Sequence, residues 1–230
     1  MSNVNDLEST PTITLSQGQS IPPKRSQEAI SHNSESTSQS YILPADVKRL
    51  NERFFQAVKD LDTPLICAWI KDPLRRTNLN SEHIRSALLD LTSMKGSHIR
   101  FRVQAVKVIL DECVVDLECV HDVYKATPLI LAAIFGEDGE SKATTKLLID
   151  KGAMLLAEDE KYHRTALSWA ARNNKIGTAT VLLEAMDKTQ YRQIIKSEDI
   201  YGCTAHGLAH KRGHKDIERL IESRGAILNA

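Results

Sequence analysis

Hydrophobic residues recur at steps of three and four positions along most of the chain after Pro44. The first set with this spacing is Val47, Leu50, Phe54, Val58 and Leu61. Because an α-helix turns once every 3.6 residues, the spacing places them on one helix face. Several shorter segments between residues 65 and 110 keep the same period, and no stretch alternates long enough to predict a sheet. We therefore expect an all-α domain from about residue 44 to the C-terminus.

Residues 1–43 have a different composition, rich in Ser and Thr and poor in branched or aromatic apolar residues. Such a segment buries too little surface to offset the entropy lost on ordering. We predict a disordered tail over residues 1–43. Its Lys24-Arg25-Ser26 segment has two interpretations: a solvated linker, or a phosphorylation site or import-signal fragment.

A seven-residue pattern occurs three times in the second half of the chain, at intervals of 38 and 39 residues. It reads TPLILAA from Thr127, TALSWAA from Thr165 and TAHGLAH from Thr204. Thr is a good N-cap, and a pair of small Ala residues lets two helices approach closely. Leucine-rich segments that end in Gly-Ala follow later, and we expect Gly152 and Gly225 to end helices there.

These residues resemble the ankyrin repeat, which opens with Thr-Pro-Leu, continues through two Ala residues, a Gly-His turn and a leucine pair, and closes on Gly-Ala. The resemblance implies an all-α ankyrin-repeat solenoid of about five helix pairs. The expected units are an N-terminal capping repeat (44–80), an ankyrin-like repeat (81–121), an ankyrin repeat (122–158), an ankyrin repeat with an insertion (159–198) and a C-terminal ankyrin repeat (199–230).

The units depart from the family pattern in three respects. A usual repeat has about 33 residues, so we expect insertions, which we place at 135–142 and 186–196. The Gly that the family has two residues before the Thr is present only as Gly202, with Lys125 and His163 in the other units. The His expected three residues after the Thr is replaced by Ile130, Ser168 and Gly207, so its hydrogen bonds are not expected here.

Composition and charge limit the function classes. Thirty Lys and Arg residues balance thirty Asp and Glu residues, which leaves no net positive field to attract nucleic acid. No run of apolar residues approaches the length of a membrane span, and we expect no membrane insertion. The four cysteines are too few for a disulfide scaffold in a chain of 230 residues. We expect a cytoplasmic protein with reduced thiols.

No motif in the sequence predicts an enzyme, a cofactor or a metal site. A phosphate-binding Gly-rich loop, a zinc-protease helix motif and a nucleophile elbow are all missing. Cys203, His206, His210 and His214 have a spacing that zinc sites use. The alternative, which we favour, is that they occupy core and turn positions of the repeat. Cys113, Cys119 and His121 lack a second pair of ligands.

Tyr124, Tyr162 and Tyr201 each precede the repeat's Thr by three residues. In stacked repeats they would lie in the loops that link one helix pair to the next, along one edge. Tyrosine and arginine are enriched among residues that dominate binding energy at interfaces. The predicted partner-binding residues are Tyr124, Lys125, Tyr162, His163, Arg164 and Tyr201. The alternative is that the tyrosines only pack across the loops, as we expect Trp69 and Trp169 to pack in the core.

The resemblance implies a protein that binds a partner protein through its finger loops and concave face, and is monomeric when alone. An inhibitor or adaptor in its own cell is one interpretation. The alternative is a secreted effector like those of intracellular bacteria, which often carry degenerate ankyrin repeats. For that alternative, Glu218, Glu222 and Leu228 resemble a C-terminal export signal.

Overall fold

A computed structural model describes residues 44–94 and 99–229, all within one compact unit that comprises residues 42–230. In chain order its helices are α1 (Pro44–Lys59), α2 (Thr63–Lys71), α3 (Pro73–Arg76), α4 (Ser81–Ser93), α5 (Ile99–Glu112), α6 (Pro128–Ile134), α7 (Asp138–Asp150), α8 (Ala166–Arg172), α9 (Ile176–Ala185), α10 (Lys188–Ile194), α11 (Ala205–Arg212) and α12 (Lys215–Asn229). The described residues form no strand, and an isolated bridge joins Glu158 to Thr165. The predicted all-α class is confirmed.

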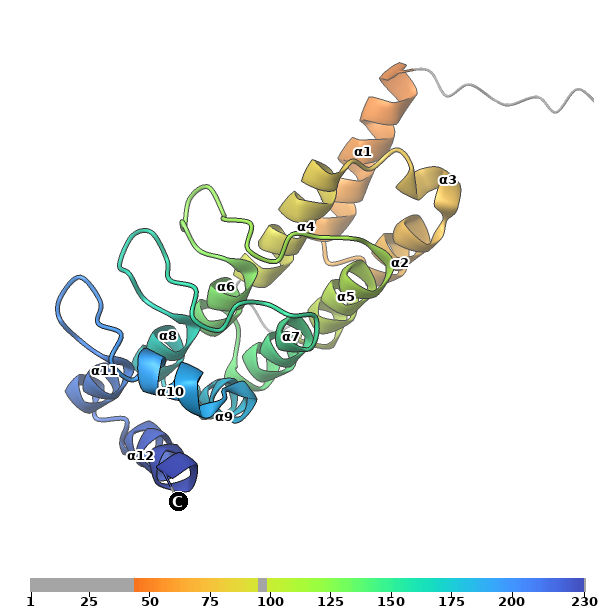
Figure 1. Ribbon diagram of the computed structural model, residues 1–230. Helices are drawn as coiled ribbons and strands as arrows, with labels where there is room; N and C mark the ends of the chain where they lie inside the picture. The colour runs from red at the N-terminus through yellow and green to blue at the C-terminus, as the bar shows by residue number, and fades with distance from the viewer. Residues whose placement is uncertain (1–43, 95–98, 230) are drawn as a thin grey trace, which may run out of the picture. The chain divides into compact units, whose positions relative to one another are not determined.

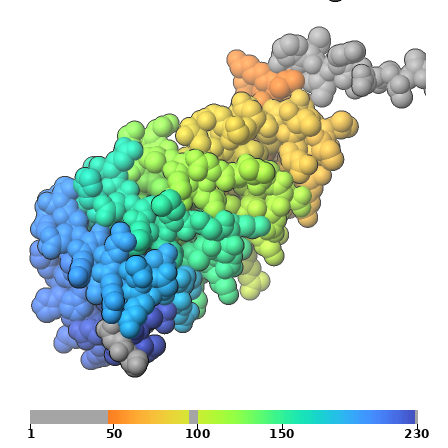
Figure 2. Space-filling view, viewed as in Figure 1, coloured from red at the N-terminus to blue at the C-terminus, as the bar shows by residue number. Residues whose placement is uncertain are grey.

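The helices pack as pairs that follow one another in chain order (Figure 1), and the colours of the space-filling view succeed one another in the same order, from orange to blue (Figure 2). The pairs in contact are α1 with α2, α4 with α5, α6 with α7, α8 with α9, and α11 with α12. One row of contacts runs from α1 through α4, α6 and α8 to α11, and a second from α2 through α5, α7 and α9 to α12. The described part of the chain is therefore a two-row stack of helix pairs, and each predicted unit contains one of these pairs.

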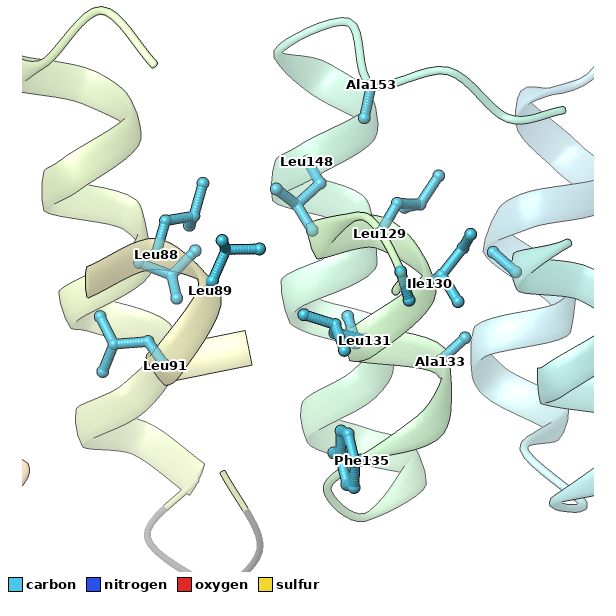
Figure 3. Packing of buried hydrophobic residues seen from close by; sticks show 14 of the residues in the cluster. Leu88, Leu89, Leu91, Leu129, Ile130, Leu131, Ala133, Phe135, Leu148 and Ala153 are labelled. Carbon is cyan, nitrogen blue, oxygen red and sulfur yellow. The ribbon is translucent and has the colours of Figure 1, made fainter. Parts of the chain in front are cut away.

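The core of the stack lies between the two rows and is built from aliphatic side chains and alanines. Leu129, Leu131 and Ala133 of α6 are each at most 1% exposed. Figure 3 shows Leu131 on the side of α6 toward the preceding pair and Ala133 on the side toward the following one. The small side chain of Ala133 lets α6 and α8 approach closely, because a larger residue would have to displace a packed neighbour.

The threonine that opens each repeat is used differently in the three units. The Oγ1 of Thr165 accepts a hydrogen bond from the backbone N–H of Ser168 and lies 3.1 Å from the Ser168 hydroxyl. Thr204 caps α11 in the same way, through the N–H of Gly207. Thr127 does not cap α6 with its side chain, and its buried hydroxyl has no hydrogen-bond partner. At the position of the expected histidine, only Ser168 supplies a side-chain hydrogen bond.

The second predicted insertion forms a helix of its own. Asp187 caps α10 by accepting hydrogen bonds from the N–H groups of Thr189 and Gln190. The hydroxyl of Tyr191 then donates a 2.6 Å hydrogen bond to the carbonyl of Ile221 in α12. At the first predicted insertion, α7 already begins at Asp138, so most of 135–142 lengthens that helix.

The expected helix end at Gly225 is wrong, because α12 continues through this residue to Asn229. A Cβ at Gly225 would lie 2.6 Å from the Tyr191 hydroxyl, so this glycine serves close approach rather than helix termination. Gly152, in contrast, has φ +94° directly after α7, as expected for a residue that ends a helix.

Charged side chains are also buried between the helix pairs. Arg102 of α5 donates hydrogen bonds to the carboxylate of Glu140 in α7 and to the carbonyl of Met94. Nearby, the Lys175 Nζ donates to the Phe135 carbonyl at 2.6 Å and the Ser141 hydroxyl at 2.7 Å. Burial lowers the pKa of Lys175 to about 8. Lys175 thus ties the start of α9 to the loop between α6 and α7.

Candidate functional site

Three loops that precede α6, α8 and α11 project from the stack (Figure 1). We define them as finger A (residues 121–126), finger B (159–164) and finger C (199–203). A backbone hydrogen bond closes each finger, from the first residue to the last: His121 to Ala126, Asp159 to Arg164 and Asp199 to Cys203. Neighbouring fingers are linked by the bonds from Glu160 N to Lys125 O and from Ile200 N to Tyr162 O. The three fingers therefore form one connected surface.

The first residue of each finger organises its turn. The Asp159 carboxylate accepts hydrogen bonds from three backbone N–H groups of its own finger, including that of Tyr162 at 2.6 Å, and from the Trp169 indole. Asp199 accepts from the N–H groups of Tyr201 and Cys203. In finger A the Nδ1 of His121 accepts a hydrogen bond from the backbone N–H of Val123. Sequence reasoning missed these residues, although an Asp that opens a polar loop is a known turn signal.

The residue two positions before the Thr adopts left-handed backbone geometry in all three fingers. The φ angles are 53° at Lys125, 54° at His163 and 68° at Gly202. Only glycine enters this region without a steric cost, so Lys125 and His163 hold a conformation that disfavours their side chains. Both side chains are exposed beside the finger tips.

Arg164 lies inside the finger surface rather than on it. Its guanidinium donates hydrogen bonds to Asp199 and lies 5.0 Å from the ring centroids of both Tyr162 and Trp169. Because its side chain is 7% exposed, it offers almost no area to a partner. The expectation that Arg164 contacts a partner directly is therefore not supported by its position. The burial depends on Asp199, which belongs to the next finger.

The three tyrosines are not equivalent. Tyr124 packs against the rings of His121 and Phe135, and Tyr162 is half-buried against Trp169, with 5.7 Å between ring centroids. Tyr201 is 65% exposed. The stack therefore brings the tyrosines along one edge, as the repeat spacing predicts, and presents Tyr201 most fully to solvent.

Exposed apolar side chains gather at the fingertips. Val123 of finger A is 74% exposed and Ile200 of finger C 53%. The helices beneath add little surface, since every residue of α6 except Ile134 and every residue of α8 except Arg172 is buried. The binding surface was expected to combine the finger loops with the concave face. Near α6 and α8 the exposed residues belong mainly to the fingers.

The residues with zinc-site spacing each contact a different group. His206 lies 3.1 Å from Glu222, His210 3.2 Å from Glu218, and the His214 Nδ1 2.9 Å from the carbonyl of Ala171. Within 44–94 and 99–229, no three His, Cys, Asp or Glu side chains come together as a metal site would require. Burial raises the pKa of Cys119 to about 11, which keeps this thiol protonated at neutral pH.

A family model described as ankyrin repeats (3 copies) matches residues 94–194. The matched range begins directly after α4 and ends with α10, so it includes fingers A and B with their helix pairs. A comparison with curated proteins found no match. None of the helices described is both long enough and apolar enough to cross a membrane.

Proposed function

Residues 94–194 of this protein are ankyrin repeats, and from this premise we propose that it binds a partner protein through fingers A, B and C. Ankyrin repeats generally serve as protein-interaction modules, and a stack of helix pairs presents an extended surface rather than a deep pocket. In this proposal the protein acts in the cytoplasm as an inhibitor or adaptor and is monomeric when alone. The four free cysteines are consistent with a reducing compartment.

The observation that carries the proposal is the set of apolar fingertips on a rigid base. Val123, Ile200 and Tyr201 expose apolar area, while backbone hydrogen bonds within and between the fingers hold their loops. A surface that is ordered before binding loses less entropy on association, so more of its contact energy remains as affinity. Tyr124, Lys125 and His163 complete the proposed contact surface, with Tyr162 and Arg164 as its support.

The proposal is tested by purifying the full chain with its bound proteins from the native cell and then measuring the affinity of the identified partner. Tyr201→Ala is expected to weaken binding by about 2 kcal/mol, roughly thirtyfold. Its denaturant midpoint should fall less than that of Tyr162→Ala, because the Tyr201 ring is 65% exposed and its centroid lies 5.8 Å from the Arg164 guanidinium. Tyr162→Ala is expected to lower both affinity and stability, because Tyr162 also supports Trp169 and Arg164.

Leu74→Ala is the matched control. Leu74 is 77% exposed on α3. This helix packs against α2, whereas the fingers precede α6, α8 and α11. Removing it takes away exposed apolar area without touching the fingers, so affinity should not change. Full affinity in Tyr201→Ala, or an equal loss in Leu74→Ala, would contradict a finger-based interface.

No observation in the structure favours the alternative of a secreted effector. Glu218 and Glu222, which contributed to it, lie on α12 within hydrogen-bond distance of His210 and His206. Both are surface contacts between α11 and α12. The proposal remains an inhibitor or adaptor.

A further inference from the structure

A cleft of about 180 Å³ lies between α4 and finger A, at one end of the finger surface. From α4 it is lined by Leu89 and Asp90, and from finger A by Asp122 and Val123. The cleft thus combines aliphatic groups with a carboxylate from each of its two sides. This composition differs from the tip of finger C, where Ile200 and Tyr201 expose apolar area.

Among the described residues, no donor forms a hydrogen bond with the side-chain carboxylate of Asp90 or of Asp122. Burial raises the pKa of Asp90, against the opposing influence of His121 and Lys59. Asp90 is therefore a partly buried carboxylate without a hydrogen-bond donor, and a cation that enters beside it would stabilise it, whereas Asp122 is exposed to solvent.

The other ionisable groups that line the cleft leave it negative. The Nη2 of Arg85 forms an ion pair with Glu82 on α4, its buried Nε has no hydrogen-bond partner, and Asp122 also lies within its electrostatic influence. The Nδ1 of His121 accepts a hydrogen bond from the backbone N–H of Val123. Without His121, the lining has three carboxylates and one guanidinium, which sum to a formal charge of −2.

We propose that this cleft receives an arginine side chain of the partner protein, its guanidinium between Asp90 and Asp122 and its aliphatic stem against Leu89 and Val123. The inference rests on the proposed function of the fingers and specifies the chemistry of the partner. Arginine fits because it joins an apolar stem to a planar donor group that pairs well with carboxylates.

The charge of the whole finger surface agrees with a basic partner segment. Four carboxylates are exposed in the fingers or at the residue before a finger: Asp122, Glu158, Glu160 and Glu198. The exposed lysines of the fingers are Lys125 and Lys161. The chain as a whole has equal numbers of acidic and basic residues. Charge is therefore segregated on this face, which favours a partner that is apolar and positively charged.

The test uses the immobilised full chain to select binders from a library of random short displayed peptides. Each recovered peptide is synthesised with arginine and again with citrulline, a neutral group of the same shape. Wild type is compared with the double variant Asp90→Asn, Asp122→Asn and with Glu52→Gln, which makes the same carboxylate-to-amide change at an exposed residue of α1. Denaturant midpoints establish that all three proteins fold.

We expect the recovered peptides to share an arginine, and each to bind wild type and Glu52→Gln about tenfold more tightly than its citrulline form, a factor worth about 1.4 kcal/mol. In the double variant this ratio should fall to near one. Peptides without a shared basic residue, or an unchanged ratio in the double variant, would overturn the arginine site.

The same peptides separate this inference from the proposed function. If citrulline peptides bind as tightly as arginine peptides but still lose affinity in Tyr201→Ala, the fingers bind and the arginine site is wrong. If neither change alters affinity, both proposals fail. A selection that recovers no peptide counts against both.

Discussion

The guanidinium of Arg164 donates hydrogen bonds from Nε and Nη2 to a single oxygen, Oδ2, of Asp199. The two distances are 2.9 and 2.6 Å, and both side chains are buried. The other carboxylate oxygen of Asp199 accepts backbone N–H groups of finger C. Asp199 therefore shapes its own finger and holds Arg164 of the preceding finger, so one ion pair connects two repeats.

Replacing Arg164 by methionine should destabilise the protein by about 3 kcal/mol, since it leaves the Asp199 carboxylate buried without its cation. Lys161→Met is the matched control, because Lys161 is exposed and lies 5.2 Å from the same Tyr162 ring. It should change stability by less than about 0.5 kcal/mol. Urea unfolding of both variants is the measurement, and equal effects would mean that the buried pair contributes nothing specific.

The opening threonines offer a second comparison, between two adjacent repeats. Thr165→Val removes an N-cap and should cost about 1 kcal/mol. Thr127→Val removes a buried hydroxyl that has no partner, so it should be neutral or stabilising. Thermal unfolding of the two isosteric variants measures the difference. A similar loss in both would show that Thr127 also caps its helix in solution.

The sequence was sufficient to predict the helix pairs and the repeats, because both depend on local spacing. The three-and-four period from Val47 to Val58 predicts α1, and the seven-residue patterns from Thr127, Thr165 and Thr204 mark the starts of α6, α8 and α11. Leu61, expected on the same helix face, instead follows the end of α1 at Lys59, with φ 53°. The sequence also predicts that Tyr124, Tyr162 and Tyr201 occupy equivalent loop positions, because each lies three residues before the threonine of its repeat.

Contacts between distant residues could not be predicted in the same way. Arg164 is buried because Asp199, 35 residues later, lies opposite it. A glycine fits at position 225 of α12 because the Tyr191 hydroxyl lies where a Cβ would be, and no local pattern at Gly225 reveals that neighbour. The arginine-binding cleft likewise depends on the approach of finger A to α4.

Lys125→Gly should stabilise the protein by about 0.5 kcal/mol. Relief of the left-handed strain at φ 53° contributes about 1 kcal/mol, and the added flexibility of the unfolded chain offsets part of it. Glu160→Gly, at an exposed finger residue without positive φ, should destabilise by about 0.5 to 1 kcal/mol. Equal effects in the two variants, measured by urea unfolding, would show that the strain at Lys125 is negligible.

Lys175 should make stability depend on pH in the alkaline range. Its folded pKa of about 8 lies below the ordinary lysine value of 10.5, so between these pH values the unfolded chain binds more protons than the folded one. The free energy of unfolding then rises with pH, whereas below about pH 8 both states are charged and the dependence disappears. Relative to Lys175→Met, wild type should gain up to about 3 kcal/mol between pH 7 and 10.5.

The comparison with Lys175→Met removes the contributions of the cysteines, which titrate in the same range and are present in both proteins. Lys146→Met, at an exposed lysine on α7, serves as the control and should follow the wild-type curve at every pH. Urea unfolding across the range gives the three curves. Parallel curves for wild type and Lys175→Met would mean that Lys175 keeps its proton, held by the Phe135 carbonyl and the Ser141 hydroxyl despite its burial.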